Sequence, residues 1–77
     1  MPQLSLLEPK GVVWEGQARE VFLPAADGEM CVLDFHQPFF IRLARGRVRF
    51  PGGDVPVIEG IAVMKGNRLN VYIEREA

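Results

Sequence analysis

Short apolar runs separated by glycine and proline are the feature that most restricts the fold of this chain. Eight glycines and six prolines are spread along the 77 residues and are not gathered in one linker. Between them lie runs rich in Val, Ile, Leu and Phe, and none of these runs has the apolar period of an amphipathic helix. Spacing of this kind is typical of a β-sandwich or barrel. The sequence therefore predicts an all-β fold.

The same punctuation predicts where the strands and tight turns lie. Strands are expected at residues 3–7, 12–15, 18–23, 29–33, 39–43, 47–50, 55–58, 61–64 and 68–74. In the last of these, Leu69, Val71 and Ile73 alternate with polar residues or Tyr72, which gives this strand an inward face. Asp27-Gly28 and Gly66-Asn67 supply residues that tolerate positive φ, as tight hairpins require.

The amount of apolar side chain is high for a chain of this size. At 77 residues the chain, residues 1–77, is expected to form a single domain. Unbroken apolar triplets occupy 12–14, 21–23, 39–41 and 71–73. Because neighbouring strand residues point to opposite faces, each triplet sends at least one large side chain outward. Loops or closure of the sheet could cover these side chains, but we favour a partner surface.

Charge and cysteine content exclude several classes of protein. The formal net charge is −1 and the isoelectric point is about 5.7, which argues against a dedicated nucleic-acid binder. No apolar run approaches the length of a membrane-spanning helix, and Met1-Pro2-Gln3-Leu4 does not resemble a secretory signal. Cys31 is the only cysteine, so neither an internal disulfide nor a cysteine-based metal site can form. These features predict a soluble, intracellular protein.

The candidate catalytic residues are few. His36 is the only histidine, and with Glu29 and Asp34 nearby it offers too small a ligand set for a typical metal site. We interpret it as a structural or interface residue, and we expect Cys31 to be a small buried hydrophobe. The glycine turn at residues 51–54 lacks the Lys and Ser/Thr of a phosphate-binding loop. The sequence therefore predicts no active site, no metal and no cofactor.

Four arginines lie close together, at positions Arg42, Arg45, Arg47 and Arg49. Arg42, Arg47 and Arg49, together with nearby phenylalanines, could form a small OB-like nucleic-acid-binding module, which stays open as an alternative function. The cluster could also bind an acidic protein surface. The simpler interpretation is a solvated strand face balanced by carboxylates elsewhere in the chain.

Several segments follow one another in an order that resembles the epsilon subunit of F-type ATP synthases. Residues 6–16 are similar to that family's opening pattern, apolar-x-T-P-x-G-x-apolar-aromatic-x-G. Residues 21–33 are similar to V-x-L-P-G-x-D-G-E-x-G-I-L, and residues 34–40 to P-G-H-A-P-L-L. Residues 58–63 and 67–71 continue the likeness near the end of the chain. The combination of D-G-E with H-x-P is the most distinctive part of the resemblance.

The resemblance implies a two-sheet β-sandwich of about nine or ten short strands. It also implies a non-catalytic subunit of the central stalk that couples the c ring to the gamma subunit during ion-driven ATP synthesis. Such a subunit belongs to a complex at the cytoplasmic face of the inner membrane, without a cofactor, nucleic acid or direct membrane insertion. The c-ring contact implied by the family falls on Asp27, Gly28, Glu29 and Met30. The gamma-subunit contact falls on His36, Pro38, Ile41 and Arg42.

The sequence also departs from the family pattern. Cys31 replaces the glycine after D-G-E-x, and Asp34-Phe35 replaces the P-G before the histidine. Most members continue into a helical hairpin, whereas this sequence stops at residues 74–77, where that hairpin would begin. Inhibition of ATP hydrolysis and nucleotide binding by that element are therefore not expected here.

Overall fold

The regular structure consists of nine β-strands in the computed structural model, which describes residues 1–76. The strands are β1 (Gln3–Glu8), β2 (Gly11–Gln17), β3 (Val21–Ala25), β4 (Gly28–Val32), β5 (Phe39–Leu43), β6 (Gly46–Phe50), β7 (Gly53–Val57), β8 (Glu59–Lys65) and β9 (Arg68–Glu74). The predicted all-β class is confirmed, and most strand bounds agree with the prediction to within one or two residues. The main difference is at β3, which starts at Val21 because Ala18 lies in the preceding connection, where its amide donates to the Pro2 carbonyl at 3.0 Å.

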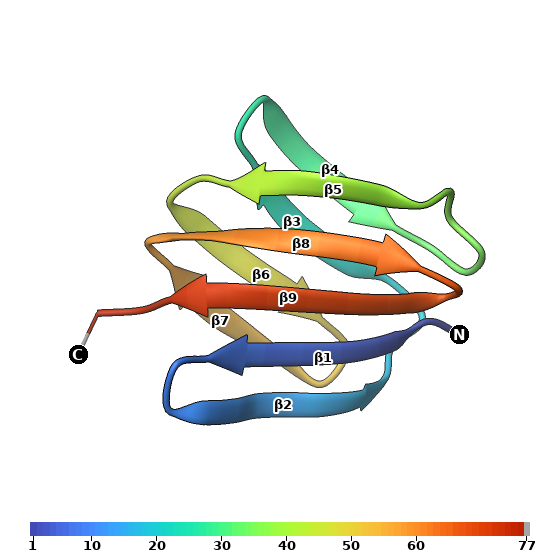
Figure 1. The fold of residues 1–77 in the computed structure, drawn as a ribbon, viewed down its shortest axis with the longest axis horizontal. Coiled ribbons are helices and arrows are strands. Elements are labelled where there is room, and N and C mark those ends of the chain that lie inside the picture. The colour runs from blue at the N-terminus through green and yellow to red at the C-terminus, as the bar shows by residue number, and fades with distance from the viewer. Residues whose placement is uncertain (77) are drawn as a thin grey trace.

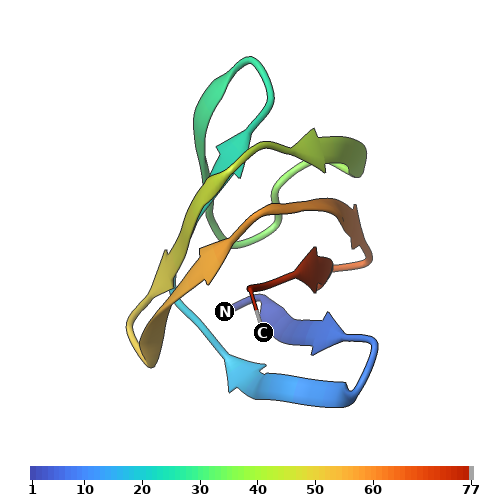
Figure 2. The ribbon, with the colours of Figure 1, turned by 90° about the vertical axis from the view of Figure 1, so that its left-hand side faces the viewer.

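The strands form one continuous sheet that curls over into two layers (Figures 1 and 2). The first layer has the order β2-β1-β9-β8-β5, and the second consists of β6 and β7 with β3 and its partner β4. A single residue pair, Ala25 with Leu43, connects β3 to β5 at the fold between the layers. The sandwich implied by the resemblance is therefore present, with its two layers joined along one side. The pairing of β1 with β9 is parallel and the other pairings are antiparallel.

The core lies between the two layers and is apolar throughout. The fully buried side chains come from alternate strand positions and include Leu4, Leu6, Val21, Leu23, Val48, Met64, Leu69 and Val71. No buried polar side chain is found among the described residues. Trp14 of β2 packs on Phe50 of β6 with ring centroids 4.6 Å apart, so that an aromatic pair fills the side where the layers are not hydrogen-bonded. Each fully buried Leu, Val or Met contributes roughly 1.5–3 kcal/mol.

The turn between β8 and β9 confirms one sequence prediction. Gly66 and Asn67 have φ of 57° and 59°, and Lys65 pairs with Arg68 around them. Positive φ at both central residues defines the tight hairpin turn that suits the twist of the flanking strands. This turn sets the register of β8 against β9, and that register determines which side chains share the outer face.

Candidate docking surface

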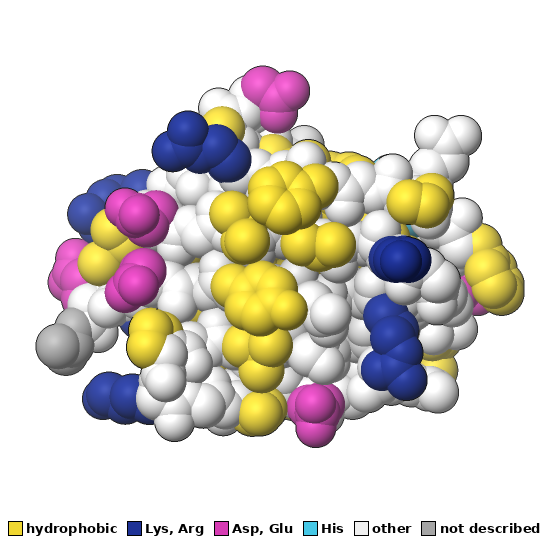
Figure 3. All heavy atoms as spheres, viewed as in Figure 1, with side chains coloured by type: hydrophobic (Ala, Val, Ile, Leu, Met, Phe, Trp, Pro, Cys, Tyr) yellow, Lys and Arg dark blue, Asp and Glu magenta, His cyan; other side chains and the backbone are white. Residues whose placement is uncertain are grey.

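A stripe of apolar side chains crosses the outer face of the first layer. Strand alternation turns Leu7, Val12, Phe40, Ile61, Val63 and Tyr72 away from the core, and we call these six residues the apolar stripe. Phe40 is 69% exposed, Val12 is 59% exposed and Tyr72 is 44% exposed, while the other three are half-buried. Figure 3 shows this band running across the middle of the face, at right angles to the strands of Figure 1.

The stripe is continuous because of strand register. Ile61 of β8 lies opposite Tyr72 of β9, Tyr72 lies beside Leu7 of β1, and Leu7 lies opposite Val12 of β2. Phe40 of β5 lies opposite Val63 of β8 and extends the band at its other end. Paired residues in adjacent strands point to the same face. Side chains far apart in sequence thereby form one surface.

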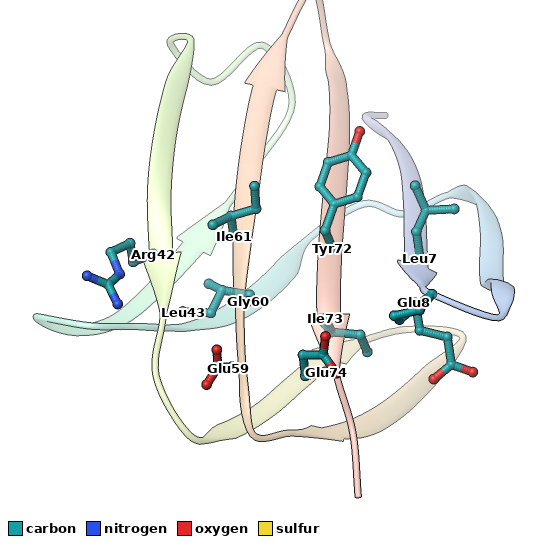
Figure 4. Close-up of a pocket in the computed structure, with 11 residues that line it drawn as sticks. Leu7, Glu8, Arg42, Leu43, Glu59, Gly60, Ile61, Tyr72, Ile73 and Glu74 are labelled. Atoms are coloured by element: carbon teal, nitrogen blue, oxygen red, sulfur yellow. The ribbon is translucent and has the colours of Figure 1, made fainter. Parts of the chain in front are cut away.

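A groove of about 420 Å³ runs along one side of the stripe. Figure 4 shows Ile61, Tyr72 and Leu7 along one edge, with Glu59, Glu74 and Glu8 on the other. Gly60 lies in the groove between these edges, where an added Cβ would collide with the backbone oxygen of Tyr72. Only glycine therefore fits at this point of β8.

The carboxylates of the groove differ in their partners. Arg75 donates from Nε and from Nη2 to the two carboxylate oxygens of Glu8, each at 2.9 Å. These hydrogen bonds are the main reason that the pKa of Glu8 is lowered and that of Arg75 is raised. Glu59 and Glu74 lie directly opposite each other in β8 and β9, and neither has an ion-pair partner among residues 1–76. Like charges in this arrangement repel each other.

The outer face of the second layer is charged and its charges are paired. Arg47 contacts Asp54 at 2.7 Å, and Arg49 contacts Glu29 at 2.6 Å. The Arg49 guanidinium also lies 4.8 Å from the ring centroid of Phe22, so it covers the outward side chain of the second apolar triplet. A phosphate backbone would have to displace these carboxylates, which disfavours the OB-like nucleic-acid alternative. Arg45, another arginine of the cluster noted in the sequence, contacts Glu76 at 3.3 Å.

The four residues implied as a c-ring contact lie at the hairpin between β3 and β4, which projects from the top of the molecule in Figure 1. Asp27 is exposed in the two-residue turn, and Gly28 follows with φ of 134°. Glu29 is exposed but is held by Arg49, whereas Met30 packs against the core. The tip therefore presents one carboxylate without an ion pair among the described residues, that of Asp27, beside one that is already engaged.

The residues implied as a gamma contact do not share one face. Arg42 points outward at the β5 end of the stripe, whereas Ile41 packs against the buried core. His36 and Pro38 belong to the loop before β5, where the His36 ring meets Phe39 edge-on at 5.3 Å. The structure therefore brings Arg42 to the stripe and separates Ile41 from it.

The loop that holds His36 is tied to the turn between β8 and β9. The Asn67 side chain accepts a hydrogen bond from the Phe35 amide and donates one to Asp34, each at 2.9 Å. The bond from Asn67, followed by one from the chain's amino group, lowers the pKa of Asp34. Phe35 itself has φ of 55° and a side chain that is 81% exposed. This network fixes the position of a loop that is otherwise exposed.

The prediction for Cys31 was wrong, because its side chain is exposed. Cys31 of β4 lies opposite Phe22 of β3, and strand alternation turns its side chain to the outside of the sheet. Partial desolvation, followed by the charges of Glu20 and Glu29, raises the pKa of the thiol. A raised pKa keeps the thiol protonated and therefore a poor nucleophile.

Within residues 1–76 no group of His, Cys, Asp and Glu side chains is arranged to hold a metal ion. A membrane-crossing helix is likewise not present in this described part of the chain. The surface features that stand out are consequently the apolar stripe and the groove beside it.

Sequence reasoning predicted outward apolar side chains but did not identify the stripe. It named the triplets that contain Val12, Phe40 and Tyr72, without placing those three residues on one surface. Ile61 and Leu7 were missed as surface residues because they lie in runs that look like core. The available signal was the alternation of β8 and β9 together with the Gly66-Asn67 turn, which aligns the two strands.

Comparison with known proteins gives consistent results. A family model described as "ATP synthase, Delta/Epsilon chain, beta-sandwich domain" matches residues 2–75. The chain is 36% identical over 73 residues to the chloroplastic ATP synthase epsilon chain of Tetradesmus obliquus, covering 90% of this chain and 54% of the relative. It is 34% identical over 73 residues to the ATP synthase epsilon chain of Gloeobacter violaceus, covering 90% and 55%. The chain thus spans about half the length of these relatives.

Solved structures show the same fold. A chain in the central stalk/c-ring structure of the Tetrahymena thermophila mitochondrial ATP synthase superposes with a TM-score of 0.83 at 10% identity, covering 95% of this chain and 63% of that chain. A chain of the Euglena gracilis mitochondrial ATP synthase superposes with a TM-score of 0.78 at 21% identity, covering 91% and 48%. The strand pattern, the curled two-layer sheet and the match over residues 2–75 agree, and the chain belongs to the ATP synthase delta/epsilon family, whose beta-sandwich domain it forms.

Proposed function

We propose that this chain is a non-catalytic subunit of the central stalk of a rotary F-type ATP synthase, with the apolar stripe docked on the gamma subunit. The observation that carries the proposal is the stripe itself. Phe40, Val12 and Tyr72 are aligned on one face while the opposite face is charged and paired. Exposed apolar surface arranged in this way is typical of an interaction site. Membership of the family supports gamma as the partner.

The second contact in the proposal is made by the hairpin between β3 and β4. Its tip carries Asp27 and Glu29, with Gly28 between them and Met30 anchored in the core. In this proposal the tip meets polar loops of the c ring, so that rotation of the ring turns gamma as one body. Because Arg49 already holds Glu29, Asp27 is the carboxylate available for a charge-assisted contact. The assembly then lies at the cytoplasmic face of an ion-translocating membrane.

The stripe is tested by binding to the cognate gamma subunit, measured by isothermal titration calorimetry and native mass spectrometry. We expect a one-to-one complex that Tyr72→Asp weakens about 100-fold, because Tyr72 lies at the centre of the stripe. Pro56→Asp is the matched control, since Pro56 is an exposed apolar residue on the opposite face and receives the same charge. Absence of a complex with gamma, or equal losses for both variants, would overturn the proposal.

The hairpin contact is tested in reconstituted membranes that contain the full complex. Asp27→Lys is expected to reduce ion pumping per ATP hydrolysed while leaving the thermal unfolding of the chain unchanged, because exposed turn tips tolerate substitution. Lys10→Asp reverses a charge in a different exposed turn, between β1 and β2, and serves as the control. Unchanged coupling in Asp27→Lys would contradict a c-ring contact at the tip.

A further inference from the structure

We infer that the partner element on the apolar stripe is a single amphipathic α-helix lying across the strands, with basic side chains along one flank and acidic side chains along the other. This inference rests on the proposed function and specifies the chemistry of the gamma segment that docks. It draws on the shape of the stripe and on the unpaired charges on either side of it.

The shape of the stripe fits a helix. It runs from β5 to β2 across four strand spacings, which makes it about 19 Å long. The stripe is narrow. Phe40 and Val63 lie opposite each other in β5 and β8, but the residues that continue this row in β9 and β1 are Asn70 and Ser5, which are polar. A helix that presents apolar residues at every third or fourth position has an apolar face of similar width, and about 13 residues cover this length. Helices dock in apolar grooves in this way.

The charged pairs at the two ends of β8 and β9 differ in sign. On one side Glu59 and Glu74 form an opposed pair, and on the other side Lys65 and Arg68 form a second opposed pair. All four point outward at the ends of β8 and β9, and none has an ion-pair partner among residues 1–76. In Figure 3 acidic side chains lie to the left of the middle of the band, with basic side chains above and below them, and a column of basic side chains lies to its right.

Each pair places like charges directly opposite each other, which costs stability in the free chain. A partner that brings a cation to the Glu59–Glu74 side and an anion to the Lys65–Arg68 side relieves both repulsions at once. The groove of about 420 Å³ lies on the acidic side, and it offers room for a Lys or Arg side chain with its apolar stem against Ile61 and Tyr72. Arg42 lines the β5 end of this groove, and its positive charge would repel a cation there, so the incoming cation is expected beside the two glutamates.

The charge pattern is tested by reversing one pair at a time. Glu59→Lys/Glu74→Lys and Lys65→Glu/Arg68→Glu each replace one like-charged pair by another, so their effects on the fold are matched. Each double variant is expected to bind the gamma subunit about tenfold more weakly at low ionic strength, and the difference shrinks at high salt because of screening. Arg47→Asp/Asp54→Arg exchanges an ion pair on the opposite face and is expected to bind like the wild type.

The helix is tested by photo-crosslinking from the two ends of the stripe. Benzoylphenylalanine is placed at Phe40 in one variant and at Val12 in another, and the crosslinked residues of gamma are identified by mass spectrometry. A helix across the stripe predicts two sites about 12–13 residues apart in one gamma segment, whereas an extended strand predicts about 6. Sites in separate gamma segments, in a second copy of this chain, or in residues that follow residue 77 of a longer form would overturn the inference.

The outcomes separate this inference from the proposed function. If the wild-type chain does not bind gamma, the proposed function fails. If it binds gamma with the stripe, as Tyr72→Asp reports, but both charge reversals bind within about twofold of the wild type, only the helix inference fails.

Discussion

The outer face of β2, β1, β9, β8 and β5 leaves Phe40 and Tyr72 in solvent, whereas the outer face of the second layer covers Phe22 with the guanidinium of Arg49. The strands of both faces contain the same kind of apolar triplet. On the second layer the strand opposite supplies an arginine, and a glutamate from β4 holds that arginine at 2.6 Å. On the first layer the residues paired with Phe40 and Tyr72 are themselves apolar, namely Val63, Ile61 and Leu7. An outward apolar residue therefore does not by itself indicate an interface; its cross-strand neighbours decide whether it is covered.

The charges of the two faces follow the same distinction. Arg47 and Arg49 are paired within the chain, while Glu59, Glu74, Lys65 and Arg68 are arranged as like-charged pairs. Intramolecular ion pairs neutralise the charges of a surface that faces water. Opposed like charges beside an apolar stripe lower the stability of the free chain. In the proposed complex the partner compensates them.

The largest expected effect is a difference in stability between substitutions at an inward and an outward residue of β5. Ile41→Asp is expected to lower the free energy of unfolding by about 3 kcal/mol or more, because it brings an unpaired charge to the core. Phe40→Asp, one residue earlier and outward, is expected to cost less than about 1 kcal/mol. Urea unfolding followed by tryptophan fluorescence of Trp14 measures both. Similar losses for the two variants would mean that Phe40 is also a core residue.

The next largest effect concerns Arg49 on the outer face of the second layer. Arg49→Ala removes both the ion pair with Glu29 and the cover over Phe22, and we expect it to lower the free energy of unfolding by about 1 kcal/mol. Arg42→Ala is the matched control on the first face and should change stability by no more than a few tenths of a kcal/mol. If Arg42→Ala lowers the free energy of unfolding as much as Arg49→Ala does, the two outer faces do not differ in how their apolar side chains are covered.

A pH-dependent effect arises at the end of the groove. Hydrogen bonds from Arg75 lower the folded-state pKa of Glu8, so the stabilisation is present above the unfolded pKa of about 4.3 and is lost as the pH falls through the lower folded pKa. The melting temperature of Arg75→Ala should lie below that of the wild type near pH 6, and the gap should close toward pH 3. A gap that is constant over this range would contradict the contribution of Glu8.

The smallest effect concerns the like-charged pair beside the stripe. Glu59→Gln and Glu74→Gln are each expected to raise the free energy of unfolding by a few tenths of a kcal/mol at low salt, because either one removes the repulsion. The double variant should gain little more than a single one. Additive gains measured by chemical unfolding would show that the two carboxylates do not interact.

The strands and turns were predicted well because they depend on neighbours in sequence. Alternation over residues 68–74 and the Gly66-Asn67 turn are local properties, and both are confirmed in the structure. Cys31 was assigned to the core from the same kind of local evidence, and that prediction was wrong. Its flanking residues Met30 and Val32 do point inward, and a shift of one residue in a strand changes the face.

The sequence by itself determined the all-β class, the positions of the nine strands and the presence of more apolar side chains than one face of each strand requires. These follow from steric preferences at turns and from the two-residue period of a strand, which act over a few residues. Only the tertiary structure decided that Leu7, Val12, Ile61 and Tyr72 form one row and that Arg49 covers Phe22. The physical reason is that register and layer packing join strands separated by as many as 65 residues, as in the pairing of Leu7 with Tyr72, and no local pattern encodes which strands become neighbours.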